Sequence, residues 1–340
     1  MIYRSKAPLR IGLAGGGTDV SPYCDLYGGA ILNATISLNA YANIEPIEEN
    51  AIILHAVDRK EEQRYEWNNE LIIDGKLDLL KGVYNHIQKV YGVPLTGFRL
   101  STFVDAPAGS GLGTSSTLVV AIIGAFAEML RLPLGEYDIA QMAYEIERKQ
   151  LKMAGGRQDQ YAATFGGVNY MEFFADEKVI VNPLRIKQQY LFELENNLLL
   201  YYTSTSRESA KIIEKQSQNV KDKQGKSIEA MHQLKNQAQL MKEALLKGRV
   251  HEIGEILDFG FRQKKEMAEG ISNSLMEDIY EAAKKAGASG GKISGAGGGG
   301  FMIFYCPANT KFSVMEAIAN FGGYCKNYQF VDHGLSTWTI

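Results

Sequence analysis

The order of apolar and polar positions predicts that the chain begins with a β-sheet. From about residue 30 to residue 65, short β-branched and aromatic segments alternate with Glu-Asn and Asp-Arg turn material. A further strand is predicted over 98–106, where the residues from Phe98 to Val104 alternate between two faces. After a glycine-rich stretch, residues 116–130 are apolar nearly all round, which is typical of a buried helix.

Later segments alternate between helical and extended patterns. Residues 134–152 have apolar residues at helical spacing, and so do residues 231–245. The second of these spans barely two heptads, so we expect a helix packed on the protein body and no coiled coil. In the C-terminal part we predict an apolar strand that begins at residue 198 and runs into a polar turn by residue 206. We also predict helices over 274–286 and 310–321 and strands over 324–331 and 335–340. This order indicates an α+β fold.

Length and composition favour two folded domains. The chain has 340 residues, of which 45% are hydrophobic, so it can bury more than one core. The weakest boundary lies between about residues 172 and 198, and we predict domains over 1–183 and 184–340. The net charge of -3 argues against a protein that neutralises nucleic-acid phosphates or anionic lipid. We expect no nucleic-acid or membrane partner, and a homodimer stays open.

The same considerations predict a cytoplasmic protein. No stretch approaches the ~18 apolar residues of a membrane span, and the first residues are too rich in charge and glycine for a signal peptide. Cys24, Cys306 and Cys325 have no CxxC spacing, which argues against a disulfide framework or a zinc site. The scattered histidines are assigned no chemistry.

The glycine-rich stretch 107–116, PAGSGLGTSS, is a candidate anion site. Gly109, Gly111 and Gly113 stand at alternate positions between the predicted strand and helix. Such a loop exposes backbone N–H groups at the positive end of a helix dipole, although a tight turn with positive φ is the alternative. The loop lacks the lysine of a P-loop and the third glycine of a dinucleotide loop. The hydroxyls that follow could bind Mg²⁺ or cap the helix, and they belong to Thr114, Ser115 and Ser116.

Three motifs resemble those of the GHMP kinases, the superfamily of galactokinase, homoserine kinase, mevalonate kinase and phosphomevalonate kinase. PAGSGLGTSS resembles the second motif of the superfamily, with Thr114 in place of a serine. APLRIGLAGGGTD, residues 7–19, is similar to the first motif, with Leu9 in place of a glycine, and KISGAGGGG, residues 292–300, to the third. The resemblance implies an N-terminal domain like domain 2 of ribosomal protein S5, a ferredoxin-like C-terminal domain and an ATP cleft between them. It also implies ATP and Mg²⁺ as cofactors.

The resemblance assigns roles to individual residues. It makes Asp159 the base and Arg10 a fixed positive charge; a helix-capping aspartate before a helix at Gln160 and a surface arginine are the alternatives. It makes Glu147 a magnesium ligand together with Thr114 or Ser115, whereas Glu145 faces elsewhere. The residues it assigns to the phosphates of ATP are Pro107, Gly109, Ser110, Gly111, Leu112, Gly113, Thr114, Ser115 and Ser116. The glycines of 295–300 are expected to support this loop.

The first motif also bears on the substrate. Its AGGGTD form differs from the Gly-Glu-His-Thr-Asp of galactokinases and is similar to that of heptose kinases, which phosphorylate D-glycero-D-manno-heptose 7-phosphate at the anomeric hydroxyl. Fucokinases commonly have a tryptophan where this chain has Gly17. A fucokinase or related sugar-1-kinase, a non-catalytic sugar sensor and a diphosphate decarboxylase are the alternatives.

We expect the sugar to contact this turn and a second anion site. Arg207 is the candidate for the phosphate that the sugar already carries, with Lys211 and Arg157 next, although each could be an ordinary exposed charge. The residues expected to contact the sugar itself are Gly16, Gly17, Thr18, Asp19 and Gly156.

Overall fold

The structure is a computed structural model of residues 1–340, and it describes all of them except 68–69, 94–96 and 206–208. The described residues contain an eight-stranded sheet with the order β12-β1-β2-β5-β3-β4, in which β6 pairs with β2 and β7 with β6. The strands of this first sheet are β1 (Tyr3–Ala14), β2 (Gly29–Pro46), β3 (Ala51–Ala56), β4 (Glu61–Glu66), β5 (Phe98–Val104), β6 (Val168–Phe173), β7 (Val179–Pro183) and β12 (Ser336–Thr339).

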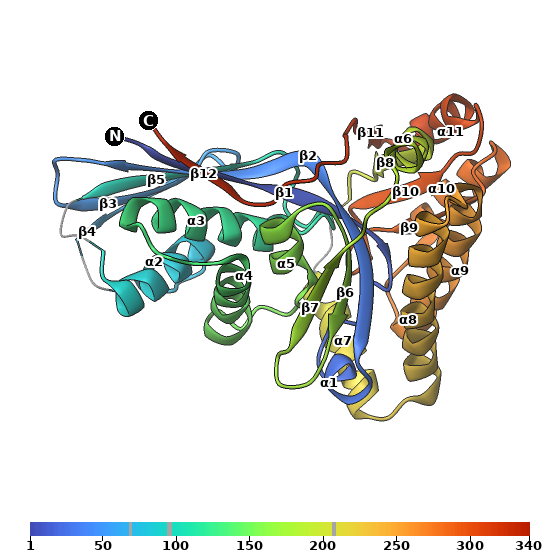
Figure 1. Ribbon diagram of the computed structural model, residues 1–340, viewed down its shortest axis with the longest axis horizontal. Coiled ribbons are helices and arrows are strands. Elements are labelled where there is room, and N and C mark those ends of the chain that lie inside the picture. Colours follow the sequence, from blue (N-terminus) through green and yellow to red (C-terminus); the bar gives the residue numbers. More distant parts are fainter. Residues whose placement is uncertain (68–69, 94–96, 206–208) are drawn as a thin grey trace.

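A smaller antiparallel sheet lies beside the first (Figure 1). Its order is β11-β8-β10-β9, and its strands are β8 (Leu198–Tyr202), β9 (Gly290–Ile293), β10 (Phe301–Tyr305) and β11 (Tyr324–Cys325). The two sheets share an apolar core, in which Leu9 of β1 and Leu200 of β8 belong to one cluster of buried side chains. Any site at the end of β1 therefore faces both parts of the molecule.

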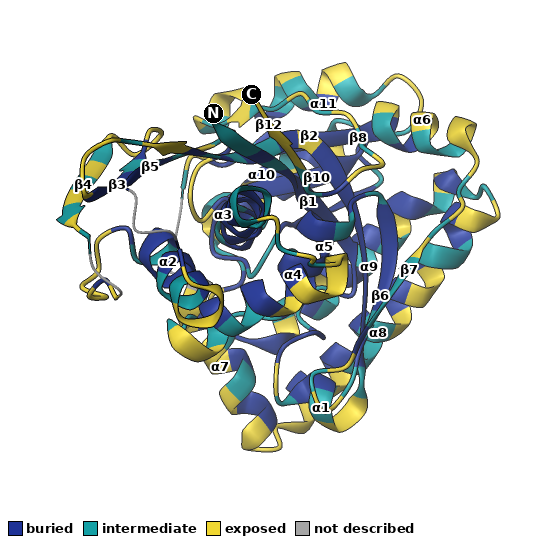
Figure 2. Ribbon diagram, turned by 60° about the vertical axis from the view of Figure 1, so that its left-hand side comes forward, coloured by how far each residue is buried: buried dark blue, intermediate teal, exposed yellow. Residues whose placement is uncertain are grey.

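Helices cover one face of the first sheet and surround the second (Figure 1). The helix α3 (Thr114–Leu130) packs directly on β1 and β2 and is buried along most of its length (Figure 2). A π-helical turn, η1 (Glu145–Gln150), continues α4. The remaining helices are α1 (Tyr23–Tyr27), α2 (Asp78–Tyr91), α4 (Glu136–Tyr144), α5 (Gln158–Phe165), α6 (Gln188–Asn197), α7 (Ser209–Lys221), α8 (Gly225–Leu246), α9 (Ile253–Met267), α10 (Ser274–Lys285) and α11 (Lys311–Ile318). Over the described ranges, no helix has both the length and the apolar character that a membrane crossing requires.

The α+β prediction is confirmed, and so are the strand β5 and the buried helix α3. The predicted strand over 324–331 is wrong beyond Cys325. Its later aromatic residues Tyr328 and Phe330 pack against the shared core, and Phe330 forms only an isolated bridge to Ile36. Packing of single aromatic side chains therefore explains the alternation that suggested a strand.

The last strand returns to the first sheet. β12 pairs antiparallel with β1, with Arg4 opposite Trp338, and the two chain ends lie close together (Figure 1). Apart from β12, the strands of the first sheet precede residue 184 and those of the second follow it. The division into domains 1–183 and 184–340 stays a prediction.

Candidate active site

A cavity of about 400 Å³ lies where the end of β1, the 107–113 loop, α5 and α9 meet. Segments far apart in the sequence therefore contribute to one site between the two sheets. Its lining includes most of the residues predicted for the site. These are Arg10, Gly16, Gly17, Asp19, Gly109, Gly111, Gly113, Thr114, Ser115, Ser116, Glu147, Gly156 and Asp159.

The loop glycines adopt the backbone conformation that favours glycine. Gly109, Gly111 and Gly113 have φ values of 71°, 83° and 79°. A Cβ on Gly111 would lie 2.5 Å from the Ser294 carbonyl oxygen, so no side chain fits there. A Cβ on Gly300 would likewise lie 2.4 Å from the Ser110 carbonyl oxygen. The second glycine cluster thus packs directly on the first loop, and α3 begins immediately behind it, as an anion site at a helix N-terminus requires.

Three predicted loop ligands are not among the residues that line the cavity. Pro107 is exposed at the outer end of the loop, and its carbonyl accepts a hydrogen bond from the Ser110 N–H at 3.2 Å. Ser110 and Leu112 are fully buried, and Leu112 belongs to the shared core. Leu112 packs in the core and Ser110 Oγ is buried without a hydrogen-bond partner, whereas the glycines and the hydroxyls of residues 114–116 line the cavity.

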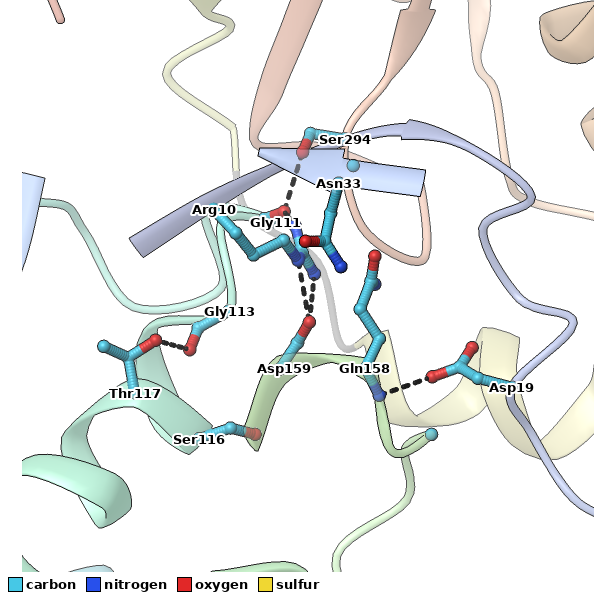
Figure 3. A network of polar contacts seen from close by, with 12 residues as sticks. Arg10, Asp19, Asn33, Gly111, Gly113, Ser116, Thr117, Gln158, Asp159 and Ser294 are labelled. Carbon is cyan, nitrogen blue, oxygen red and sulfur yellow. Dashed lines mark hydrogen bonds and ion pairs between the residues drawn. The ribbon is translucent and has the colours of Figure 1, made fainter. Parts of the chain in front are cut away.

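Arg10 joins the loop to Asp159 (Figure 3). The guanidinium is 3% exposed, and its Nε and Nη2 both lie 2.7 Å from Asp159 Oδ1. Its Nη1 donates to the Gly111 carbonyl at 2.6 Å. The helix α5 begins at Gln158, so Asp159 lies within its first turn and directs its carboxylate toward Arg10. A buried cation beside a carboxylate at a phosphate loop is suited to phosphoryl transfer.

Asp19 anchors the helix that carries Asp159. Its Oδ2 accepts hydrogen bonds from the backbone N–H groups of Arg157 and Gln158, each at 2.9 Å. A Cβ on Gly156 would lie 1.9 Å from the same oxygen, so the close approach requires glycine. Burial raises the pKa of Asp19, and the charge of Asp159 adds to the effect. The helix-end role proposed as the alternative for Asp159 therefore belongs to Asp19.

In the rest of the Gly-Gly-Gly-Thr-Asp turn, two glycines line the cavity and the threonine is buried. Gly16 and Gly17 line the cavity. Thr18 is fully buried and is not among the lining residues; its hydroxyl lies 2.9 Å from the Gly15 carbonyl oxygen and 3.0 Å from that of Ala30. Its hydroxyl thus fixes the turn, and the geometry does not support a contact with the sugar.

The residues around Glu147 fit a hard cation. Glu147 is fully buried on η1, and its Oε2 accepts a hydrogen bond from Gln160 Nε2 at 2.5 Å. The same amide nitrogen lies 3.1 Å from Ser116 Oγ, so the hydroxyl and the carboxylate are held side by side. Glu147 Oε1 is buried without a hydrogen-bond partner. Mg²⁺ prefers such oxygen ligands and keeps several waters.

Ser116, which the family resemblance did not assign to the metal, lies beside Glu147. Ser116 is connected to Glu147 through Gln160, whereas Thr114 and Ser115 share only the cavity with it. Within the described ranges, no group of three or more His, Cys, Asp and Glu residues is arranged to hold a metal. A metal here would need hydroxyl, phosphate and water oxygens in addition to Glu147.

Of the residues predicted for a second anion, the described ones, Lys211 and Arg157, do not line this cavity. Arg207 lies outside the described residues, and Lys211 is on α7 and is not among the lining residues. Arg157 donates to Asp25 at 3.0 Å and to the Phe174 carbonyl at 2.9 Å. Its guanidinium is therefore already used within the protein.

The structure instead reveals two buried lysines that the sequence analysis missed. Lys264 of α9 and Lys292 of β9 are 4% and 5% exposed, and both line the cavity. Lys292 is the first residue of the third motif, in which only the glycines suggested a role. No helix was predicted over α9, so no pattern pointed to Lys264.

Two models of one family match the chain on either side of residue 184. The N-terminal domain model of the GHMP kinases matches residues 78–167, and the C-terminal model matches residues 241–323. The chain is also 48% identical to a D-glycero-alpha-D-manno-heptose 7-phosphate kinase from Campylobacter jejuni over 337 residues, which are 99% of each chain.

Solved structures agree with this similarity. A D-glycero-D-manno-heptose 1-phosphate kinase from Bacteroides thetaiotaomicron has 46% identity and a TM-score of 0.84 over 99% of both chains. A galactokinase from Lactococcus lactis has a TM-score of 0.79 over 98% of this chain and 95% of that one, and at 17% identity it shows the fold alone. The chain belongs to the GHMP kinase family and is accordingly a phosphotransferase that uses ATP.

Proposed function

We propose that this kinase transfers the γ-phosphoryl group of ATP to the anomeric hydroxyl of D-glycero-D-manno-heptose 7-phosphate, giving the 1,7-bisphosphate. The observation that carries the chemistry is Arg10, which contacts both the phosphate loop and Asp159. The substrate follows from the AGGGTD turn and from two relatives, whose names both specify a phosphorylated heptose.

The proposed roles follow from the contacts. The N–H groups of the 109–113 loop bind the phosphates of ATP, because the glycines leave the backbone open to the cavity. Asp159 accepts the proton of the attacking hydroxyl, since its carboxylate faces the cavity beside the loop. Arg10 stays protonated and stabilises the negative charge of the transferring group.

A second cavity suits the adenosine end of ATP. It has a volume of about 370 Å³ and shares Ser115 and Met153 with the first. Leucines of α2 and α3, among them Leu80 and Leu118, contribute to its lining. The lining also includes polar residues, among them Asp58, Arg59 and Thr102, and a mixed pocket beside a phosphate loop fits a base whose phosphates lie on the loop.

Mg²⁺ is part of the proposal, with Glu147 and the hydroxyls of Thr114, Ser115 or Ser116 as its protein ligands. When bound, it would neutralise charge on the phosphates of ATP. The buried Oε1 of Glu147 supports this assignment, because it accepts no hydrogen bond and the nearby Arg148 Nη1, at 3.6 Å, does not bind it directly, so a metal ion would complete its contacts.

Product analysis tests the proposal. The purified protein is incubated with Mg-ATP and heptose 7-phosphate, and the product is examined by phosphorus NMR with proton coupling. We expect a new phosphate on C1 while the 7-phosphate is retained. Turnover of heptose 1-phosphate in place of the 7-phosphate, or transfer to fucose, would contradict the proposal.

A further inference from the structure

Lys264 and Lys292 lie in the protein interior without the partners that buried charges normally have. Lys292 Nζ donates to the Gly12 carbonyl at 2.8 Å, and Lys264 Nζ reaches the Gly16 carbonyl at 3.4 Å. Among the described residues, neither ammonium has a carboxylate within ion-pairing distance. Because a buried ammonium is costly unless it is paired, a pair of them indicates that an anion completes this site.

The two ammonium groups converge on one place. A Cβ built on Gly16 would lie 3.5 Å from Lys264 Nζ and 3.8 Å from Lys292 Nζ. Both lysines line the cavity, so the space between them opens to it. Burial lowers the pKa of Lys264 to about 8 and that of Lys292 well below its usual value, and each is also lowered by the charge of Arg10.

The neighbouring acidic groups offset only part of this positive charge, and Glu214 of α7, which also lines the cavity, is exposed to solvent. Asp159 is paired with Arg10, and Glu147 lies beside Arg148 at 3.6 Å. Asp19 raises the pKa of Lys264 through its charge, but its Oδ2 is occupied by two backbone N–H groups. With both lysines protonated, this part of the cavity carries a net positive charge, and a bound anion would favour that protonated state.

The site extends from Arg10 toward the Gly-Gly-Gly-Thr-Asp turn, and the charge of Arg10 lowers the pKa of both lysines. The lysines contact carbonyls of Gly12 and Gly16, which lie two and six residues beyond Arg10 along the chain. Two residues of extended strand span about 7 Å. An anion held between these ammonium groups would therefore lie toward the Gly-Gly-Gly-Thr-Asp turn, where the sugar is expected.

Gln158 adds a neutral contact between the two centres. It is 8% exposed and lines the cavity, and its Oε1 has no hydrogen-bond partner. That oxygen lies 3.5 Å from the position of a Cβ on Gly12, so it faces the same space as Lys292. A sugar hydroxyl is the donor that this oxygen lacks.

We propose that Lys264 and Lys292 bind the phosphate that the sugar substrate already carries, while Gln158 accepts a hydrogen bond from a hydroxyl of the same sugar. This inference rests on the proposed function, because it assigns the distal phosphate of that substrate. Lys264 and Lys292 thereby select a phosphorylated sugar over its unphosphorylated form, and they replace Arg207 as our candidates for this contact.

The test uses Lys264→Met and Lys292→Met in the full chain, with Lys265→Met as the matched control. Lys265 is the next residue of α9, but it pairs with Glu277 at 3.0 Å and is not among the lining residues. Calorimetry without ATP measures the Kd of heptose 7-phosphate. Steady-state kinetics measures kcat/KM for heptose 7-phosphate and for unphosphorylated heptose, and KM for ATP.

We expect each lysine variant to weaken binding of heptose 7-phosphate by about 10- to 100-fold. The preference for the phosphorylated over the unphosphorylated sugar should fall by a similar factor, while KM for ATP and the control variant stay near wild type. An unchanged Kd or preference in both variants overturns the inference. A raised KM for ATP with unchanged sugar binding overturns it too, because the lysines would then serve the nucleotide phosphates.

Thermal unfolding separates binding from folding. Replacing a buried, unpaired ammonium by methionine removes a desolvation cost, so Lys264→Met should melt at or above the wild-type temperature. A large decrease in Tm for both variants would contradict the inference, since it would make the lysines structural. If wild-type protein neither binds nor turns over heptose 7-phosphate, the proposed function fails, and that outcome differs from failure of the lysine variants alone.

Discussion

At the residue scale, Arg10 couples two parts of the transfer centre. Its guanidinium contacts the Gly111 carbonyl and the Asp159 carboxylate, so it fixes the position of the loop relative to the carboxylate. Asp19 holds the start of α5, which carries Asp159, because its carboxylate accepts hydrogen bonds from the backbone N–H groups of Arg157 and Gln158. Rigid placement of this kind is what phosphoryl transfer mainly requires.

Asp159→Asn should lower kcat by between about 100- and 10,000-fold, because the amide cannot accept the proton of the attacking hydroxyl. The Kd of ATP should change little, since the loop N–H groups remain. Single-turnover kinetics and ATP calorimetry measure the two effects, with Asp332→Asn at an exposed position as control. Near-normal turnover by Asp159→Asn would remove Asp159 from the role of base.

Glu147→Gln should raise the Mg²⁺ concentration needed for half-maximal activity by about tenfold or more, because a charged ligand oxygen is lost. Glu145→Gln is the matched control. Glu145 lies two residues earlier, is 35% exposed at its side chain and contacts Lys149 at 3.8 Å. Equal Mg²⁺ dependence in the two variants would show that Glu147 is no metal ligand.

The pKa of Lys264 predicts a pH effect. Burial lowers that pKa to about 8, so the ammonium loses its proton as the pH rises through 8. The charged groups that act on it come from other elements, namely Asp19, Arg10 and Lys292. We expect kcat/KM for heptose 7-phosphate to fall above pH 8, because neutral lysine attracts the phosphate less. The unphosphorylated sugar should lack this decline, and an identical pH profile for both sugars would argue against the assignment.

At the element scale, the phosphate loop depends on the cluster 295–300 packed against it. Gly111 and Gly300 each approach the opposite segment too closely for a side chain. The loop therefore keeps its shape through contacts with the second half of the chain. The conformation of the loop therefore depends on its contacts with residues 294–300.

Gly111→Ala should lower kcat/KM for ATP by about 100-fold, because the new methyl group would displace the loop from the Ser294 carbonyl. Gly270→Ala is a close control, since both glycines have a φ of 83° and nothing lies within 4 Å of a Cβ at Gly270. Both variants bear the cost of positive φ, about 1–2 kcal/mol, and only Gly111→Ala adds a clash. Equal effects of the two variants on ATP kinetics would refute this account of the loop.

The sequence predicted the elements whose pattern is local. Periodicity identified β5 and α3, and the glycine spacing identified the loop between them. Alternation wrongly predicted a strand over 324–331, where aromatic side chains pack on the shared core and no strand continues beyond Cys325. Tertiary packing, which no local pattern records, decides such segments.

For the site, motif resemblance identified residues that come together, among them Arg10, Asp19, Glu147 and Asp159. The resemblance could not distinguish Thr18, which is fully buried and does not line the cavity, from its neighbours in the turn. Nor could it find Lys264, because a lysine on an amphipathic helix is an ordinary surface residue by sequence. Only the packing of α9 against the turn after β1 places that ammonium inside.

At the scale of the whole molecule, the site exists because the two sheets share a core. The first sheet supplies Arg10 and the turn with Asp19, while the second half of the chain supplies Lys264, Lys292 and the glycines beneath the phosphate loop. ATP phosphates and a sugar phosphate are both anionic, and the cations come from different elements: Arg10 lies on β1, whereas Lys264 of α9 and Lys292 of β9 contact the carbonyls of Gly16 and Gly12. This arrangement allows two anionic substrates to be bound in one cavity.

The most direct test of the central claim is a substrate panel with purified protein and Mg-ATP. It compares kcat/KM for heptose 7-phosphate, unphosphorylated heptose, fucose, galactose, mevalonate and homoserine under the same conditions. Our account predicts that heptose 7-phosphate is preferred by a large factor over every other acceptor. A higher kcat/KM for fucose or for unphosphorylated heptose would contradict it.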